Sequence, residues 1–261
     1  MIEVILLLIT GGIGLGQAVS DPRQVAGRWL LRGTIIATVL LTVAAVAAVV
    51  TRGDRSPWSV LTLMIAPAAA VIIQLWCVWT LAWPMLHRML GGVLFIACVI
   101  AVQWIPQMHT GSDGESAGVL HALAPAASSA AASGLLGGFL MTMLLGHAYL
   151  TAGGEMTQRP FRRLTIMLAV LLVIRLAISA WFGLRPWVQS ASPPAAWDVM
   201  LVTARGLLGF VAPAMFIYMI YDCVRRRANQ SATGILYVAL VMVIIGEGTA
   251  LSLAASTGFA F

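Results

Sequence analysis

The sequence predicts an all-α polytopic membrane protein with eight transmembrane helices, arranged as two tandem, same-orientation four-helix repeats. Three observations support this prediction. The chain is 61% hydrophobic and only 9% charged, whereas soluble domains carry roughly 25% charged residues. It contains eight apolar runs, and about 20 apolar residues are enough to cross a hydrocarbon core of ~30 Å. Its second half also resembles its first half, segment by segment.

The expected spans follow one another with mostly short connections. In chain order they cover residues 2–19, 33–51, 58–83, 89–106, 134–152, 164–184, 198–221 and 232–255. Their length and the lack of alternating polarity favour helices over the strands of a barrel.

Four sequence matches in the same order, at offsets of about 130 to 146 residues, indicate a tandem duplication. Two of them pair LRGTIIATVLL (31–41) with RRLTIMLAVLL (162–172) and APAAAVIIQLWCV (66–78) with APAMFIYMIYDCV (212–224). We therefore expect three parts in the chain. They are a first four-helix repeat (1–106), an outward-facing and partly helical linker (107–133), and a second four-helix repeat (134–261) that carries a buried polar cluster.

Small residues and one proline predict where helices approach or bend. Gly12 with Gly16, and Gly134 with Gly138, have the spacing that lets two membrane helices come close together. Pro213 lies inside an expected span, where a missing backbone hydrogen bond bends a helix.

The arginines predict the orientation. All fifteen basic residues are arginine, which is typical of proteins from GC-rich bacterial genomes, and most lie in the odd-numbered connections. Basic connections remain cytoplasmic, so we expect a bacterial inner membrane protein with both termini on the periplasmic side. Lipid headgroups account for the net charge of +6 without nucleic acid as a partner.

Only the second repeat has charged residues deep inside its apolar segments: Arg175, Arg205 and Glu247. At about 1.5 Å per residue, all three lie roughly 10 to 15 Å below the outer boundary, so we expect one cluster. One Arg–Glu pair neutralises itself, and the second arginine then attracts a carboxylate, a phosphate, a haem propionate or a quinone carbonyl. In the alternative interpretation, Arg205 snorkels outward and the other two only join helices.

His147 and Tyr149, in LLGHAYLTAGGE, complete the expected cofactor-binding set. We expect His147 roughly 8 to 12 Å below the arginine layer. That separation suits a b-type haem whose iron binds His147 while its propionates reach Arg175 and Arg205, or a quinone contacted by His147. A hydrogen-bonded packing role for the histidine is the alternative. Bis-histidine ligation is not expected, because His87 is predicted to be interfacial.

The favoured hypothesis is a membrane subunit of a respiratory or electron-transfer system. It would bind a quinone or haem b in the second four-helix unit, beside partner subunits. The alternatives are a transporter of a small anion or a proton-coupled solute, and a non-catalytic assembly or anchor subunit. Whether the protein is an enzyme stays open, since the sequence has no nucleotide-binding loop, HExxH motif or nucleophile elbow. The 4+4 plan resembles that of the haem A synthase family, whose glutamate–histidine motifs this chain lacks.

Overall fold

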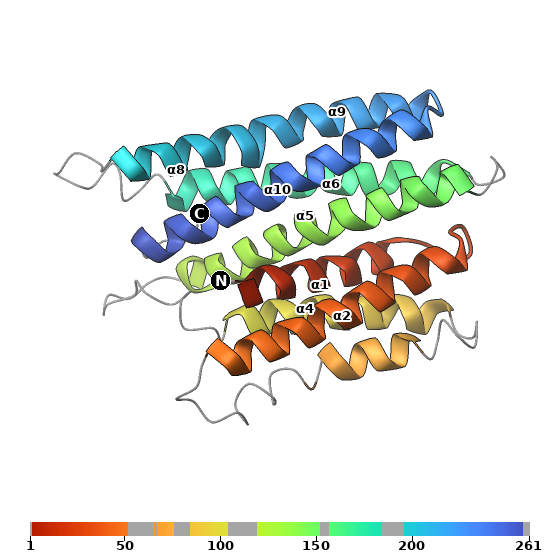
Figure 1. The fold of residues 1–261 in the computed structure, drawn as a ribbon, viewed down its shortest axis with the longest axis horizontal. Helices are drawn as coiled ribbons and strands as arrows, with labels where there is room; N and C mark the ends of the chain where they lie inside the picture. The colour runs from red at the N-terminus through yellow and green to blue at the C-terminus, as the bar shows by residue number, and fades with distance from the viewer. Residues whose placement is uncertain are drawn as a thin grey trace.

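The computed structural model describes residues 2–51, 65, 67–75, 84–103, 119–151, 157–183 and 196–257, and its regular elements there are all helical (Figure 1). The labelled helices are α1 (Ile2–Val19), α2 (Gly27–Thr51), α4 (Pro84–Gln103), α5 (Val119–Thr151), α6 (Arg159–Gly183), α8 (Ala196–Gly206), the π-helix η2 (Leu207–Val211), α9 (Ala212–Arg225) and α10 (Asn229–Thr257). Residues 67–75 are also helical.

Seven helical segments of the described chain are long and apolar enough to cross a membrane. The first is α1, and the sixth runs without a break through α8, η2 and α9. The prediction of a multi-pass helical membrane protein is therefore confirmed. The expected span 58–83 lies largely outside the described residues, so the number of eight spans stays a prediction. Large apolar side chains such as Val39, Val46 and Val170 are exposed, which is the surface that lipid covers.

Two helices, α1 and α5, lie side by side in the centre of the molecule and run in the same direction (Figure 1). Helices α2 and α4 pack against α1, whereas α6 and α10 pack against α5. The segment from α8 to α9 packs on α10, and α9 also packs on α6. We call α5, α6, α8 to α9 and α10 the C-terminal bundle. This arrangement agrees with two units of one orientation, but the tandem duplication itself stays a prediction.

The expected linker at 107–133 is described only from residue 119 on. Helix α5 already begins at Val119, so residues 119–133 are helical, as expected. Of the described side chains in this stretch, Leu123 is 57% exposed and others are buried. Ser128 and Ser133 are buried, and the Ser133 hydroxyl donates a hydrogen bond of 2.8 Å to the Leu8 carbonyl of α1. The Ala/Ser-rich run is too weakly apolar to face lipid, yet small side chains are suited to burial between helices. Helix α5 is accordingly the most buried of the candidate spans.

The backbones of α1 and α5 touch where the two helices cross. A Cβ atom on Gly12 would lie 1.8 Å from the Ser133 carbonyl oxygen, and one on Gly137 would lie 2.3 Å from the Gly12 carbonyl carbon. The expected close approach at Gly12 is confirmed, with Gly137 as its partner. Gly138 faces side chains of α6, and Gly134 faces Leu171 of α6 and Leu15 of α1, so the small residues of α5 serve two interfaces.

Next to Pro213, where a bend was expected, the helix contains the π-helix η2, which ends two residues before the proline. A proline has no N–H to donate to the preceding turn, and a wider turn accommodates the loss. Within η2, Gly209 lies against α10, because a Cβ atom on Gly246 would be 2.4 Å from the Gly209 Cα. This close approach brings the end of α8 next to Glu247.

Candidate functional site

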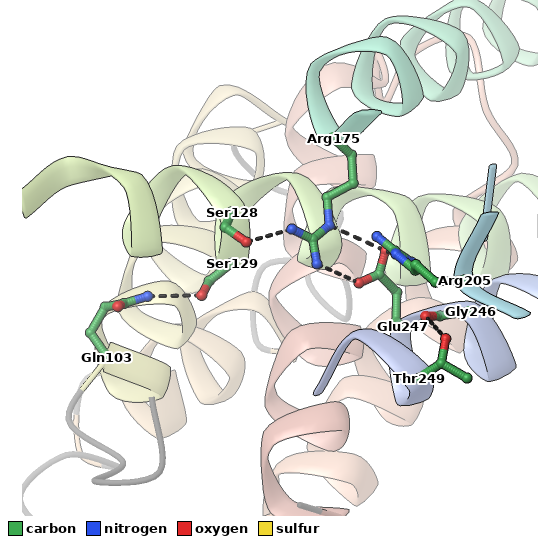
Figure 2. Close-up of polar contacts among 8 residues, drawn as sticks. All are labelled: Gln103, Ser128, Ser129, Arg175, Arg205, Gly246, Glu247 and Thr249. Atoms are coloured by element: carbon green, nitrogen blue, oxygen red, sulfur yellow. Dashed lines mark hydrogen bonds and ion pairs between the residues drawn. The ribbon is translucent and has the colours of Figure 1, made fainter. Parts of the chain in front are cut away.

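Three ionised side chains from three helices meet inside the C-terminal bundle (Figure 2). Arg175 of α6 donates from Nη2 to Oε2 of Glu247 in α10 over 2.9 Å, and from Nε to Oε1 over 3.3 Å. Arg205 of α8 donates from Nη1 to the same Oε1 over 3.1 Å. The expected juxtaposition of these residues is thus observed. We call the three residues the Arg–Glu–Arg cluster.

The cluster lies well inside the helices that form it. Arg175 is eight residues before the end of α6, Arg205 nine residues after the start of α8, and Glu247 ten residues before the end of α10. At about 1.5 Å per residue these positions are roughly 12 to 15 Å from the helix ends. The arginines are each 3% exposed and the glutamate 2%. The interpretation in which Arg205 snorkels outward is therefore wrong.

Arg175 uses all of its nitrogen atoms. Two hold the carboxylate of Glu247 as a fork, and Nη1 donates a hydrogen bond to the Ser128 hydroxyl of α5. A bidentate charged pair of this kind is among the stronger polar contacts in proteins. It joins α5, α6 and α10 and is neutral as a pair.

Arg205 is the surplus cation of the cluster. Its Nε and Nη2 are buried and have no hydrogen-bond partner among the described residues. The guanidinium carbon lies 4.3 Å from the centroid of the Phe210 ring, which covers one face of the group. A Cβ atom on Gly209 would be 2.7 Å from Nη1, so any larger residue at position 209 would require the Arg205 side chain to shift. With two arginines and one glutamate, the cluster has a formal charge of +1.

Polar contacts extend from the cluster to the N-terminal half of the molecule (Figure 2). Ser129, the neighbour of Ser128 in α5, accepts a hydrogen bond of 2.8 Å from Nε2 of Gln103 in α4. The same Nε2 donates to the Pro125 carbonyl over 3.2 Å. These three residues were not among the predicted site residues, because both serines were expected to lie in a linker. The pair of adjacent serines in an otherwise Ala-rich run was the available signal.

His147 does not join the cluster. It follows Ser128 by nineteen residues in the same helix and is exposed, so the two are roughly 28 Å apart along α5. The expected separation of 8 to 12 Å between His147 and the arginine layer is wrong. The estimate assumed spans that just cross the membrane, whereas α5 has 33 residues and α10 has 29. A single haem bound to His147, Arg175 and Arg205 does not fit this geometry.

Tyr149 is also remote from the cluster. Its hydroxyl donates a hydrogen bond to the Thr157 carbonyl, and its ring stacks on Phe161 with centroids 5.4 Å apart. These contacts fasten the end of α5 to the start of α6.

We expect Tyr149→Phe to lower the free energy of unfolding by about 1 kcal/mol, the usual net contribution of one hydrogen bond. The ring stacking is retained in this variant. Ligand content measured on the purified variant should equal that of the unmodified protein, and a loss of ligand would instead place Tyr149 in the site.

His87, expected to be interfacial, lies in the first turn of α4, near the end of the helix. Its side chain is 3% exposed, and neither ring nitrogen has a partner among the described residues. Its carbonyl accepts a long hydrogen bond of 3.4 Å from the Gln74 side chain. Within the described part of the chain, no three His, Cys, Asp or Glu side chains gather as metal ligands.

The difference between the two arginines is testable. Arg205→Met removes the surplus buried charge and leaves the Arg175–Glu247 fork intact, so we expect an unchanged or slightly higher free energy of unfolding in ligand-free protein. Arg175→Met removes the fork and leaves Ser128 without its donor. We expect that variant to lose about 3 kcal/mol. Unfolding of delipidated protein in mixed micelles measures both, and equal losses would contradict the surplus role of Arg205.

The fold and the cluster define the class, a multi-pass helical membrane protein with ionised side chains inside a helix bundle. Three comparisons with known proteins give no match: no protein-family model, no curated protein and no solved structure is significantly similar to the chain.

Proposed function

We propose that the protein is an integral membrane subunit of an electron-transfer system and that it binds a redox ligand beside Arg205 in the C-terminal bundle. One observation supports this proposal above the others. Two buried N–H donor atoms of Arg205, Nε and Nη2, lack a partner among the described residues. A buried donor without an acceptor costs about 1 to 3 kcal/mol, more for a charged group, and a ligand oxygen would offset that cost. Helix bundles commonly hold cofactors between their helices.

A quinone fits the residues better than haem b does. A quinone needs hydrogen-bond donors for its carbonyl oxygens, and Arg205 offers them. Haem needs an iron ligand as well, and His147 is too far from the cluster along α5. Methionine sulfur is another common haem ligand. Met215 and Met219 of α9 are 61% and 44% exposed, so their side chains lie largely on the outer surface of the described structure and not inside the bundle. When bound, a quinone supplies the electron-accepting chemistry, and the residues of the cluster orient it and exclude water.

The proposed orientation places the cluster in the periplasmic half of a bacterial inner membrane. The connections and helix ends at the end of the molecule opposite the cluster contain most of the arginines. They include Arg23, Arg28, Arg88, Arg159, Arg226 and Arg227. Basic connections remain cytoplasmic, so the start of α1 and the end of α10 would both face the periplasm. Partner subunits would then deliver or remove electrons on that side.

Analysis of the purified protein tests the proposal. Solvent extracts of unmodified protein should contain a quinone in near-stoichiometric amount, and extracts of Arg205→Met should contain at least tenfold less. Arg226→Met is the matched control, because that side chain is 74% exposed and pairs with Asp222, whose side chain is 39% exposed. A Soret band in the absorption spectrum would show that the bound ligand is haem and not a quinone. Absence of both, or equal quinone in all three proteins, would overturn the redox proposal.

Transport of a small anion is the second candidate, and the surplus positive charge of the cluster favours it. A buried charge in a membrane helix commonly lies on the path of an ion. Saturable anion uptake by proteoliposomes that is lost in Arg205→Met would support transport, whereas uptake that is equal with and without Arg205 would not.

A further inference from the structure

The two arginines of the cluster use their guanidinium groups differently (Figure 2). Arg175 donates from Nε and Nη2, the two nitrogens on one edge of the planar group, to the two carboxylate oxygens of Glu247. Arg205 donates only from Nη1, and the same edge formed by Nε and Nη2 has no partner among the described residues. The bundle therefore contains one occupied fork and one free fork, both buried.

We propose that the free edge of Arg205 binds an acid group with two oxygens, a carboxylate or a phosphate monoanion. This inference rests on the proposed ligand site beside Arg205 and names the chemistry of the group bound there. Two parallel N–H donors match two acceptor oxygens, as the Arg175–Glu247 fork illustrates within the same cluster. A quinone carbonyl presents a single oxygen to the same edge.

The charge of the cluster leads to the same conclusion independently. Two arginines face one glutamate, and all three side chains are 4% exposed or less. A second acid group brings the formal charge to zero, whereas a neutral carbonyl leaves the surplus charge in a region of low dielectric constant. At this edge an acid group is therefore a better match than a neutral carbonyl, and it takes the place that the proposed function gives to the quinone oxygen.

The packing around Arg205 fixes the direction from which that acid binds. Phe210 covers one face of the guanidinium, with 4.3 Å between the guanidinium carbon and the ring centroid. Gly209 lies close to Nη1 and the central carbon. An acid group that accepts from both Nε and Nη2 binds in the plane of the guanidinium, beside the face that Phe210 covers, and this planar geometry distinguishes arginine from lysine.

A pair of amphiphiles tests the inference. Delipidated protein in nonionic detergent is titrated with decanoate and, separately, with decanol, which has the same chain without the acid group. Decanoate should raise the midpoint of thermal unfolding saturably, and decanol should not. The effect should be abolished in Arg205→Met and weakened at least tenfold in Arg205→Lys, which keeps the charge but lacks the fork. Arg226→Met should respond like the unmodified protein. Equal responses to both amphiphiles, or an unchanged response in Arg205→Met, would overturn the inference.

Native mass spectrometry of protein purified without delipidation distinguishes the source of the acid. Loss of a bound phospholipid in Arg205→Met identifies a lipid phosphate, and loss of a carboxylate-bearing small molecule identifies a cofactor or solute. The two proposals fail separately. Arg205-dependent binding of decanoate without quinone or haem in the extract leaves this inference standing and removes the redox role. Bound quinone without decanoate binding would leave the redox proposal standing and overturn this inference.

Discussion

Glu247→Gln is expected to lower the free energy of unfolding by about 3 to 5 kcal/mol, the range measured when one partner of a buried ion pair is removed. The change leaves two buried guanidinium groups, those of Arg175 and Arg205, without a counter-ion. It also replaces an acceptor oxygen by an amide N–H that faces an arginine. Reversible unfolding of the protein in mixed micelles, followed by tryptophan fluorescence, gives the difference.

The control for this change is Asp222→Asn. Asp222 also pairs with an arginine at 2.9 Å, but its side chain is 39% exposed and that of Arg226 is 74% exposed. An exposed pair of this kind contributes up to about 1 kcal/mol, and often less. Combining Glu247→Gln with Arg175→Gln should recover part of the loss, since one of the two unpaired charges is then absent. Equal changes in the free energy of unfolding for Glu247→Gln and Asp222→Asn would show that the cluster is accessible to water.

Gly12→Ala is expected to lower the free energy of unfolding by about 3 kcal/mol, at the upper end of the usual cost of overpacking. The added methyl group would meet the Ser133 carbonyl oxygen at 1.8 Å and the Gly137 Cα at 2.7 Å. Both are backbone atoms of α5, which cannot rotate away as a side chain can. The two central helices must separate, and the hydrogen bond from Ser133 to Leu8 lengthens with them.

Gly92→Ala is the matched control for this change. Gly92 lies in α4, and a Cβ atom there would meet no atom of the described residues within 4 Å. Alanine is the better helix former, so this variant should be as stable as the unmodified protein or up to about 1 kcal/mol more stable. The same unfolding assay compares both variants. If Gly12→Ala behaved like Gly92→Ala, α1 and α5 would not cross at Gly12.

The cluster could be predicted because a charged side chain in hydrocarbon has a high free energy and therefore needs a partner. Arg175, Arg205 and Glu247 each stand alone in an apolar segment, and the constant rise of a helix places them at one depth. A single segment does not reveal which face of its helix points inward. The contacts therefore required the structure, including the difference between the satisfied Arg175 and the unsatisfied Arg205.

The first half of α5 was not predictable by the same criterion. Hydropathy measures the preference of a segment for lipid, and the alanines and serines between Val119 and Ser133 score weakly. In the structure this stretch contacts other helices, where small side chains are an advantage. The helix was therefore expected to begin fifteen residues too late, at residue 134 and not at Val119, and Ser128 was not predicted to contact the cluster. The position of His147 relative to the cluster was wrong because the helices are longer than a minimal span.

The two adjacent serines of α5 have a mechanical consequence. Ser128 contacts Arg175 in the C-terminal bundle, and Ser129 contacts Gln103 of α4. Neighbouring positions on a rigid helix move together, so a rotation of α5 that separates one pair also strains the other. At this level the two halves of the molecule cannot reorient about their shared central helix independently of each other.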